Sequence, residues 1–284
     1  MQTALGRCDR LIAAGRPNNR RPEYQAFFHA LTREEDEATA LATIAAFVES
    51  ETRGAAGKPI VLSDETLALA PMWSVVADRL SRIIPQAQIL LTVRNQLTAI
   101  PSYYANHGRS LTDVPPPYGG RYVAFDDWFD YAVRAGHCNY IKAIDYHALA
   151  STFLRYFPEA VNVLLYEDMS GERSRYVQQL SSLFGADISG FVDFSARVNP
   201  RQSKRALYYQ MLRSKLMPAV RFSQMLPGGQ RLQALAERFL KGGSSIDVTL
   251  SQEQKEVVRD RFATGNRWMH ERFQLDLGNY GYPL

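Results

Sequence analysis

The chain has 284 residues, 46% of them hydrophobic and 22% charged, which is enough to bury a substantial core and excludes disorder as its main state. It holds no run of about 18 uncharged apolar residues, so the sequence excludes a membrane-spanning helix. Its 33 Lys and Arg residues exceed its 29 Asp and Glu residues by four, a balance that suits a small anionic ligand and falls well short of a nucleic-acid-binding surface.

Three short segments have the composition of buried parallel strands: residues 59–63, 88–93 and 161–166. Each is rich in β-branched residues and Leu and is apolar on both faces, as a strand covered by helices on both sides must be. Helical patterns alternate with these segments and continue to the C-terminus. The predicted helices span residues 34–51, 71–84, 125–135, 140–156, 174–184, 203–216 and 252–272. Strands and helices in this order predict one α/β domain with a helical C-terminal portion.

The segment from Gln88 to Tyr104 combines a buried strand, an Arg at the end of the strand and a helix that carries Ser102. Ligands of open α/β sheets bind at the carboxyl ends of strands, and Arg94 lies at such an end. A guanidinium can hold a phosphate bidentately, and the Ser102 hydroxyl can add a hydrogen bond. The two residues are eight positions apart, so they converge on one anion only if the end of the strand curls back on the helix. The alternative is a structural Arg94 that pairs with a neighbouring carboxylate.

The run Val93-Arg94-Asn95 followed by Ser102-Tyr103-Tyr104 resembles the 3′-phosphate-binding motif of sulfotransferases that use 3′-phosphoadenosine 5′-phosphosulfate (PAPS). That motif has a strand, an Arg-Asn-Pro start and a Ser eight residues after the Arg; here Gln96 stands where Pro is common. Less specific segments follow the family's order from about residue 58 onward. They are Leu62-Ser-Asp-Glu65, the helix that begins at Tyr140, Tyr166-Glu167-Asp168, and the C-terminal helix with Leu275-Asp-Leu-Gly278.

The resemblance implies a three-layer parallel sheet flanked by helices, as in P-loop nucleotide-binding proteins, and transfer of a sulfuryl group from PAPS to a hydroxyl or amine. It implies that Arg94 and Ser102 hold the 3′-phosphate of PAPS and that no metal takes part. Arg201 and Lys204 resemble a loop near the nucleotide in relatives, which makes them further candidate anion contacts, with a solvated loop as the alternative. The 166–168 segment is structural in the family.

The acceptor in such a transfer must lose its proton to a base. Glu65 is the candidate, because it lies just past the strand at residues 60–62, at the same edge of the sheet as Arg94. The alternative is a carboxylate that caps a helix or pairs with an Arg. His107, three residues beyond Tyr104, is a rival candidate, as are His137 and His147, which flank the start of the predicted helix at residues 140–156. A lone His in a helix-rich region is more often structural or exposed to solvent.

Members of this family begin with a strand and a Lys-x-Gly-Thr loop whose backbone N–H groups hold the 5′-phosphosulfate. The sequence shows no such strand or loop, and residues 1–5 resemble the inside of the helix that should follow. We therefore expect residues 1–284 to be a single sulfotransferase-like domain truncated at its N-terminus. Either the missing part is encoded upstream and the natural protein is active, or the chain is a degenerate member. For the chain as given, we expect negligible transferase activity and marginal stability.

Two other classes of function stay open from the sequence. One is a nucleotide- or phosphate-binding α/β protein without transferase activity, and the other is a partner-binding domain that uses the aromatic-rich residues 118–131. The N-terminus has no apolar signal segment, and Cys8 and Cys138 have neither the number for a disulfide framework nor metal-ligand spacing. We expect a cytoplasmic protein with reduced thiols that acts on a small-molecule or carbohydrate acceptor.

Overall fold

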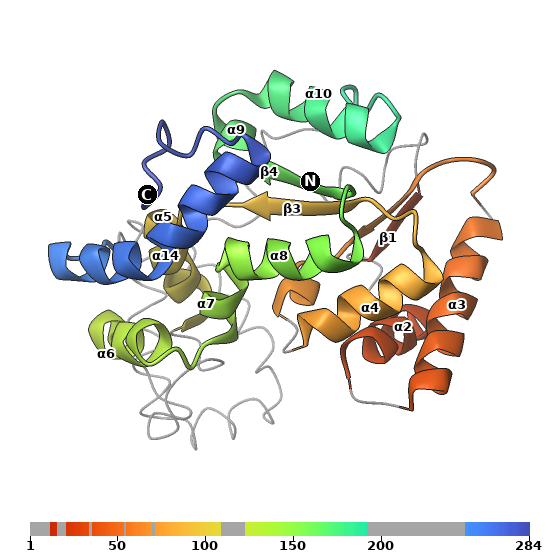
Figure 1. The fold of residues 1–284 in the computed structure, drawn as a ribbon, viewed down its shortest axis with the longest axis horizontal. Helices are drawn as coiled ribbons and strands as arrows, with labels where there is room; N and C mark the ends of the chain where they lie inside the picture. Colours follow the sequence, from red (N-terminus) through yellow and green to blue (C-terminus); the bar gives the residue numbers. More distant parts are fainter. Residues whose placement is uncertain are drawn as a thin grey trace, which may run out of the picture.

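The computed structural model describes residues 12–15, 21–33, 36–53, 55–69, 72–108, 123–191 and 248–284 (Figure 1). The side chains of residues 12–15, 65, 107 and 108 lie outside this description. Along the chain the elements are β1 (Ile12–Gly15), α2 (Pro22–Thr32), α3 (Glu37–Arg53), β2 (Ile60–Ser63), η1 (Glu65–Leu69), α4 (Trp73–Ile83), β3 (Ile89–Val93), α5 (Gln96–Tyr103), η2 (Tyr104–Gly108), α6 (Phe125–Phe129), η4 (Asp130–Arg134), α7 (Asn139–Ala143), α8 (Tyr146–Tyr156), β4 (Val161–Leu165), α9 (Tyr166–Ser170), α10 (Arg173–Phe184) and α14 (Gln252–Phe273).

The described strands form two parallel pairs, β1 with β2 and β3 with β4. Ile12 lies opposite Ile60 in the first pair, and Ile89 lies opposite Val161 in the second. The three predicted strands are confirmed as β2, β3 and β4. The structure thus has a small parallel sheet component among many helices, and among the described residues the two pairs are not hydrogen-bonded into one continuous sheet.

Strand β1 lies before the three strands that the sequence predicts and is an addition to them. Its sequence is Ile-Ala-Ala-Gly, and Ala and Gly are depleted in strands, so the local signal is weak. The strand is instead defined by its pairing with β2, a contact between residues nearly fifty positions apart that no local pattern reveals. Helix α2 follows β1 along the chain and was not predicted either.

Helices pack on both faces of the predicted strands, as their apolar composition requires. Ile60 and Ile89 pack against the cluster formed by α2, α3, α4 and α8, whereas Val61 and Leu90 pack against the α10 cluster. Successive residues of a strand point to opposite faces, so these contacts place helices on each side. Figure 1 shows α10 on one side of β3 and β4 and α8 on the other.

Most predicted helices are confirmed within a few residues, with one correction. The single helix expected over residues 140–156 is two helices, α7 and α8. The break occurs because the side chain of Asp145 accepts a hydrogen bond from the backbone N–H of Ala148 and so caps the start of α8. The helix expected at residues 203–216 lies outside the described residues.

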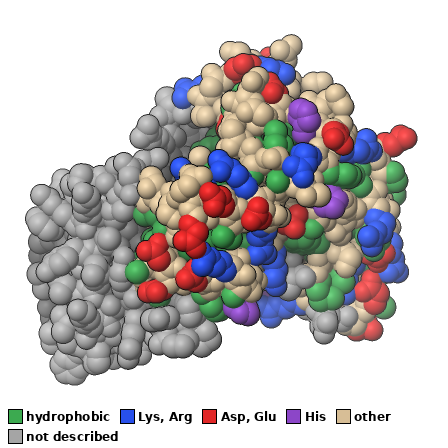
Figure 2. Space-filling view, turned by 60° about the vertical axis from the view of Figure 1, so that its left-hand side comes forward, with side chains coloured by type: hydrophobic (Ala, Val, Ile, Leu, Met, Phe, Trp, Pro, Cys, Tyr) green, Lys and Arg blue, Asp and Glu red, His purple; other side chains and the backbone are tan. Residues whose placement is uncertain are grey.

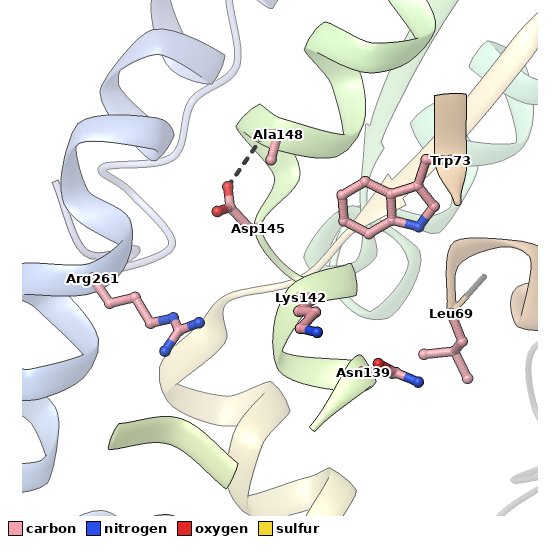
Figure 3. A pocket seen from close by; sticks show the side chains of 7 residues that line it. All are labelled: Leu69, Trp73, Asn139, Lys142, Asp145, Ala148 and Arg261. Atoms are coloured by element: carbon pink, nitrogen blue, oxygen red, sulfur yellow. Dashed lines mark hydrogen bonds between the residues drawn. The ribbon is translucent and has the colours of Figure 1, made fainter. Parts of the chain in front are cut away.

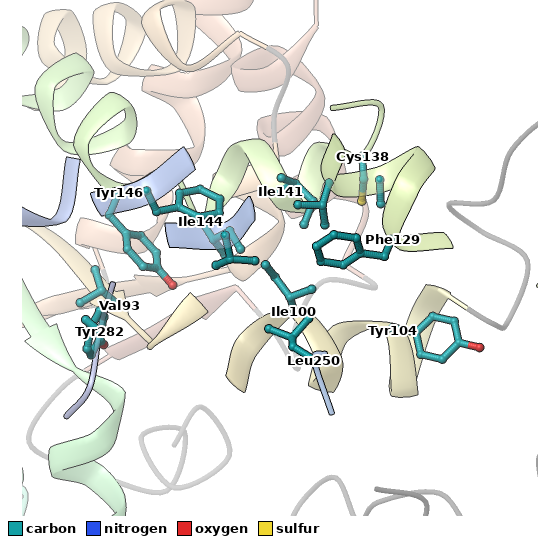
Figure 4. Packing of buried hydrophobic residues seen from close by; sticks show 14 of the residues in the cluster. Val93, Ile100, Tyr104, Phe129, Cys138, Ile141, Ile144, Tyr146, Leu250 and Tyr282 are labelled. Carbon is teal, nitrogen blue, oxygen red and sulfur yellow. The ribbon is translucent and has the colours of Figure 1, made fainter. Parts of the chain in front are cut away.

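The largest core cluster among the described residues joins α5, α6, α7, α8 and α14, and Trp128 is buried in it. Figure 4 shows other members of this cluster, among them Phe129 and Ile141. Helix α14 begins with a capping box, in which Ser251 and Gln254 bond each other's backbone N–H groups. The chain beyond α14 turns back, and Leu277 and Tyr282 are buried in the same cluster. The C-terminus therefore ends beside the start of α5 (Figure 1).

The described surface mixes both signs of charge. On the face in Figure 2, Lys and Arg side chains are interleaved with Asp and Glu side chains. None of the described helices combines the length and apolarity needed to cross a membrane.

A candidate anion-binding site at the end of β3

Arg94 comes directly after β3, and α5 starts two residues later. Its Nη1 lies 3.3 Å from the hydroxyl oxygen of Ser102, and its Nε lies 3.3 Å from that of Thr98. The end of the strand therefore folds back along α5, which is the condition that the sequence set for Arg94 and Ser102 to meet. Thr98 and Ser102 are four residues apart, so one helical turn brings both hydroxyls to the same face. That spacing could have identified Thr98 from the sequence.

The guanidinium of Arg94 forms no ion pair with any carboxylate in the described ranges. Its neighbours are the two hydroxyls and the ring of Tyr166, whose centroid lies 4.8 Å from Cζ. Arg94 is half-buried, and a partly desolvated cation without a counter-ion favours an anionic ligand. The alternative, a structural Arg94 paired with a neighbouring carboxylate, requires an acidic partner, and the described residues provide none.

Two side chains from other elements fix the backbone of Arg94 and Asn95. The hydroxyl of Tyr146 accepts a hydrogen bond from the Arg94 N–H at 3.0 Å and donates one to the Arg94 carbonyl at 2.9 Å. The carboxylate of Glu167 accepts a hydrogen bond from the Asn95 N–H at 2.9 Å. The direction in which Arg94 leaves the strand is therefore set by α8 and α9.

The side chain of Asn95 links α5 to the C-terminal segment, residues 275–284. Its Oδ1 caps α5 by accepting a hydrogen bond from the Leu97 N–H, and its Nδ2 donates to the Tyr280 carbonyl at 2.8 Å. Asn95 is buried, so losing either partner would leave a polar group unsatisfied. The capping role is readable from the sequence, whereas the contact with Tyr280 is not.

The C-terminal segment is held by three further contacts around this site. The Tyr282 hydroxyl donates to Glu167 at 2.8 Å, and the Tyr280 hydroxyl donates to Asp168. Asn266 of α14 donates to the Pro283 carbonyl at 2.8 Å and also exchanges hydrogen bonds with Gln96. Tyr280 lies 185 positions from Asn95 along the chain, so the joint role of these residues could not be found from the sequence.

Neutral tyrosines line the surroundings of Arg94. Tyr140 stacks on Tyr103 with ring centroids 3.8 Å apart, and burial raises the pKa of Tyr140 to about 12, although the positive charge of Arg94 lowers it in part. Burial also raises the pKa of Tyr146 and of Tyr282 well above the usual range. At neutral pH these hydroxyls stay protonated, so they add no negative charge that would repel an anion.

Glu65 begins η1 two residues after the end of β2, and its side chain lies outside the described residues. The adjacent Asp64 accepts hydrogen bonds from the Tyr24 hydroxyl at 2.5 Å and from Thr66, so it holds the start of η1 against α2. The turn η1 contacts α7, the helix that carries Tyr140. Glu65 thus starts an element that packs on the tyrosine-bearing wall of the Arg94 site.

The remaining candidates do not join this site among the described residues. The side chain of His107 and all of Arg201 and Lys204 lie outside the description. The rings of His137 and His147 pack against Tyr131 and Trp268, with centroids 5.1 Å and 4.7 Å apart. Cys138 is buried, and no group of three or more His, Cys, Asp or Glu that could hold a metal ion occurs in the described part of the chain.

Comparisons with known proteins give one structural likeness. No protein-family model and no curated protein matches the chain. Among solved structures, a sulfotransferase from Alicyclobacillus acidocaldarius is similar, with a TM-score of 0.47 and 18% identity over 82% of this chain and 88% of that chain. At this identity and score the likeness carries no argument on function, which therefore depends on the residues described above.

Proposed function

We propose that residues 1–284 form one sulfotransferase-like domain that transfers a sulfuryl group from PAPS to a hydroxyl or amine acceptor in the cytoplasm. The observation that carries the proposal is the convergence of Arg94 and Ser102 at the end of a parallel strand. Their order and spacing are those of the family's 3′-phosphate motif. A guanidinium without a carboxylate partner among the described residues and a nearby hydroxyl suit a phosphate monoester in charge and in hydrogen-bond donors.

In the proposed transfer, an acceptor oxygen or nitrogen forms a bond to sulfur as the bond between sulfur and the bridging oxygen of the 5′-phosphate breaks. The products are the sulfated acceptor and adenosine 3′,5′-bisphosphate, and the acceptor's proton goes to a base. The moving group is negatively charged throughout, so the protein contributes mainly positioning and charge stabilisation. Arg94 and Ser102 supply positioning by holding the end of the donor that does not react.

We assign the base to Glu65, with His107 as the rival, and keep Arg201 and Lys204 as further anion contacts. The support for Glu65 is its place at the carboxyl end of β2, on an element that packs against α7. Strand β1 followed by α2 gives the chain the strand-then-helix order that the family has around its donor loop. Residues 16–20, between β1 and α2, do not have the Lys-x-Gly-Thr sequence of that loop, so negligible activity of the chain as given stays a prediction that the experiment below decides.

A second function fits the same geometry: binding of adenosine 3′,5′-bisphosphate without transfer. Its support is that the Arg94 and Ser102 pair is present whereas no Lys-x-Gly-Thr sequence occurs in residues 1–58. The acceptor in the first function is a small molecule or a carbohydrate, and the second function needs none.

The test is incubation of the full chain with PAPS and a panel of hydroxyl and amine acceptors, with mass spectrometry of the products. Transfer predicts acceptor-dependent release of adenosine 3′,5′-bisphosphate, with loss of kcat in Glu65→Gln and a raised KM for PAPS in Arg94→Ala. Tight binding of the bisphosphate without release would favour the second function. Neither binding nor release would contradict both.

A further inference from the structure

A pocket of about 260 Å³ lies between η1, α4, α7, the start of α8 and α14 (Figure 3). Its lining includes Leu69, Trp73, Asn139, Lys142, Asp145 and Arg261. Pockets for drug-sized ligands are roughly 300–1,000 Å³, so this one suits a ligand with a single ring. None of the lining residues belongs to the contacts described around Arg94.

The pocket carries a net positive charge. Lys142 is exposed and forms no ion pair within the described ranges, and Arg261 likewise has no carboxylate partner there. The one carboxylate in the lining, Asp145, already caps α8 through the Ala148 N–H. Figure 3 shows the guanidinium of Arg261 extending from α14 toward Lys142. Two cations without counter-ions at the same pocket favour an anionic ligand.

Arg261 is held in place before any ligand arrives. Its Nη1 donates to the Val133 carbonyl at 2.6 Å. The guanidinium also packs over Gly136, where an added Cβ would lie 3.6 Å from Nη2 and where φ is +72°, a value that favours glycine. The other guanidinium N–H groups form no hydrogen bond with described residues. A fixed cation loses little entropy when it binds an anion.

The opposite wall is flat and apolar. The indole N–H of Trp73 donates to the Ala68 carbonyl at 3.0 Å, which fixes the ring beside Leu69. Asn139 is exposed, and its side chain has no hydrogen bond to any described residue, so its amide is available to a ligand hydroxyl. Asn139 and Lys142 are three positions apart on α7 and therefore share one face of that helix.

Helix α7 separates the pocket from the Arg94 site. Asn139 and Lys142 line the pocket, whereas Tyr140 stacks on Tyr103, the neighbour of Ser102. Leu69 comes from η1, the turn that Glu65 begins. The pocket therefore adjoins both the element with the proposed base and the helix beside the proposed phosphate site.

We propose that this pocket binds the acceptor, and that the acceptor is a hydroxylated single-ring acid. Its carboxylate lies between Lys142 and Arg261, its ring lies against Trp73 and Leu69, and a ring hydroxyl bonds Asn139. Calling this ligand the acceptor rests on the proposed function, whereas its binding does not. Two classes of compound have this carboxylate, ring and hydroxyl: phenolic acids and sugar acids.

The experiment is calorimetric titration of the full chain with 4-hydroxybenzoate and with D-glucuronate, each against a neutral counterpart, 4-hydroxybenzyl alcohol or methyl glucoside. We expect one acid to bind at least about tenfold more tightly than its neutral counterpart, and the acid that binds identifies the source. Lys142→Ala and Arg261→Ala should each remove most of that preference. Arg259→Ala, which deletes an exposed cation of α14 outside the lining, should leave it intact.

Equal binding of acid and neutral counterpart, binding of neither acid, or an unchanged preference in Lys142→Ala would overturn the proposal. Lys142 is exposed, so its substitution keeps the test valid even if Arg261→Ala fails to fold. Titration with adenosine 3′,5′-bisphosphate separates the two claims. Acid binding without bisphosphate binding contradicts the Arg94 site alone, and bisphosphate binding without acid binding contradicts the pocket alone.

Discussion

Two arginines of this protein, Arg79 and Arg94, have contrasting surroundings. Arg79 of α4 is 3% exposed, and its guanidinium donates to the Glu37 carboxylate and to the carbonyls of Ala30 and Arg33. Arg94 is half-buried and meets only hydroxyls and an aromatic ring among described residues. The first arginine is satisfied by protein groups, and the second has capacity left for a ligand. This difference in partners separates a structural cation from a candidate binding residue.

The partners of Arg79 also explain why it is buried. The carbonyls that it bonds lie at the C-terminal end of α2, where backbone acceptors lack helical partners, and Glu37 lies in the first turn of α3. One side chain therefore joins α2, α3 and α4. Among the described residues, the guanidinium of Arg94 bonds two hydroxyls of α5 and lies over the Tyr166 ring of α9, with no carboxylate or carbonyl partner. The backbone of Arg94 is positioned by Tyr146, and that of Asn95 by Glu167.

The largest effect is expected for Arg79→Ala. The substitution leaves the Ala30 carbonyl buried without a donor and removes the ion pair with Glu37, so the free energy of unfolding should fall by about 3 kcal/mol. Urea unfolding measures it. The matched control is Arg82→Ala, because Arg82 bonds the same carboxylate while 49% exposed, and it should lose less than about 1 kcal/mol. Similar losses in the two variants would contradict the structural role of Arg79.

A smaller loss is expected for Asn95→Ala, which removes both the cap of α5 and the contact with Tyr280. The free energy of unfolding should fall by about 2 kcal/mol, and the affinity for adenosine 3′,5′-bisphosphate should fall with it. Asn95→Ser keeps an oxygen for the cap and loses only the donor to Tyr280. Its free energy of unfolding should therefore fall by about half as much as that of Asn95→Ala. If bisphosphate affinity were unchanged in folded Asn95→Ala, the C-terminal segment would not position Arg94.

The tyrosines around Arg94 should make stability depend on alkaline pH. The pKa of Tyr280 is raised to about 12, chiefly because its hydroxyl bonds Asp168, and that of Tyr140 is raised to about 12 by burial. Between pH 10 and about 12 the unfolded chain releases these protons while the folded chain keeps them, so stability falls as pH rises through this window. Urea unfolding at several alkaline pH values should show a shallower decline in Tyr280→Phe than in the wild type. An identical decline would contradict the role of the Asp168 contact.

The smallest effect is expected for Ser102→Ala. A neutral hydroxyl contributes about 0.5–1.5 kcal/mol, so bisphosphate affinity should fall by roughly two- to tenfold with no change in the midpoint of urea unfolding. Ser81→Ala removes a hydroxyl that bonds the Asp78 carbonyl within α4, and it serves as the matched control. If Ser81→Ala weakened bisphosphate binding as much as Ser102→Ala, the loss of affinity in Ser102→Ala would not come from a contact at the Arg94 site.

Local sequence patterns predict the strands and helices whose own residues show an apolar run, a helical periodicity or a cap. Strands β2, β3 and β4 are apolar on both faces, and α14 has a capping residue and a long helical pattern, so these were predictable. Strand β1, of Ala and Gly with one Ile, depends on a distant partner and was missed. The break before α8 depends on Asp145 as a cap, a signal that the sequence contained and that the helical periodicity around it obscured.

The candidate site shows the same division. The pair of Arg94 and Ser102 could be predicted because both lie on consecutive elements with a recognisable spacing. The groups that position them, Tyr146, Glu167 and the C-terminal segment, come from three distant parts of the chain. The different partners of Arg79 and Arg94 could not be predicted from the sequence either. They depend on which carboxylates and carbonyls the fold brings within hydrogen-bond distance of each guanidinium.

The central claim is that Arg94 recognises the 3′-phosphate of the donor, and one measurement tests it most directly. Calorimetry compares adenosine 3′,5′-bisphosphate with adenosine 5′-phosphate, which lacks that group, on wild type and Arg94→Ala. A charge-assisted contact contributes about 1.5–3 kcal/mol, so wild type should prefer the bisphosphate by at least about tenfold, and Arg94→Ala should lose that preference while its unfolding free energy stays unchanged. An equal preference in both proteins would contradict the account.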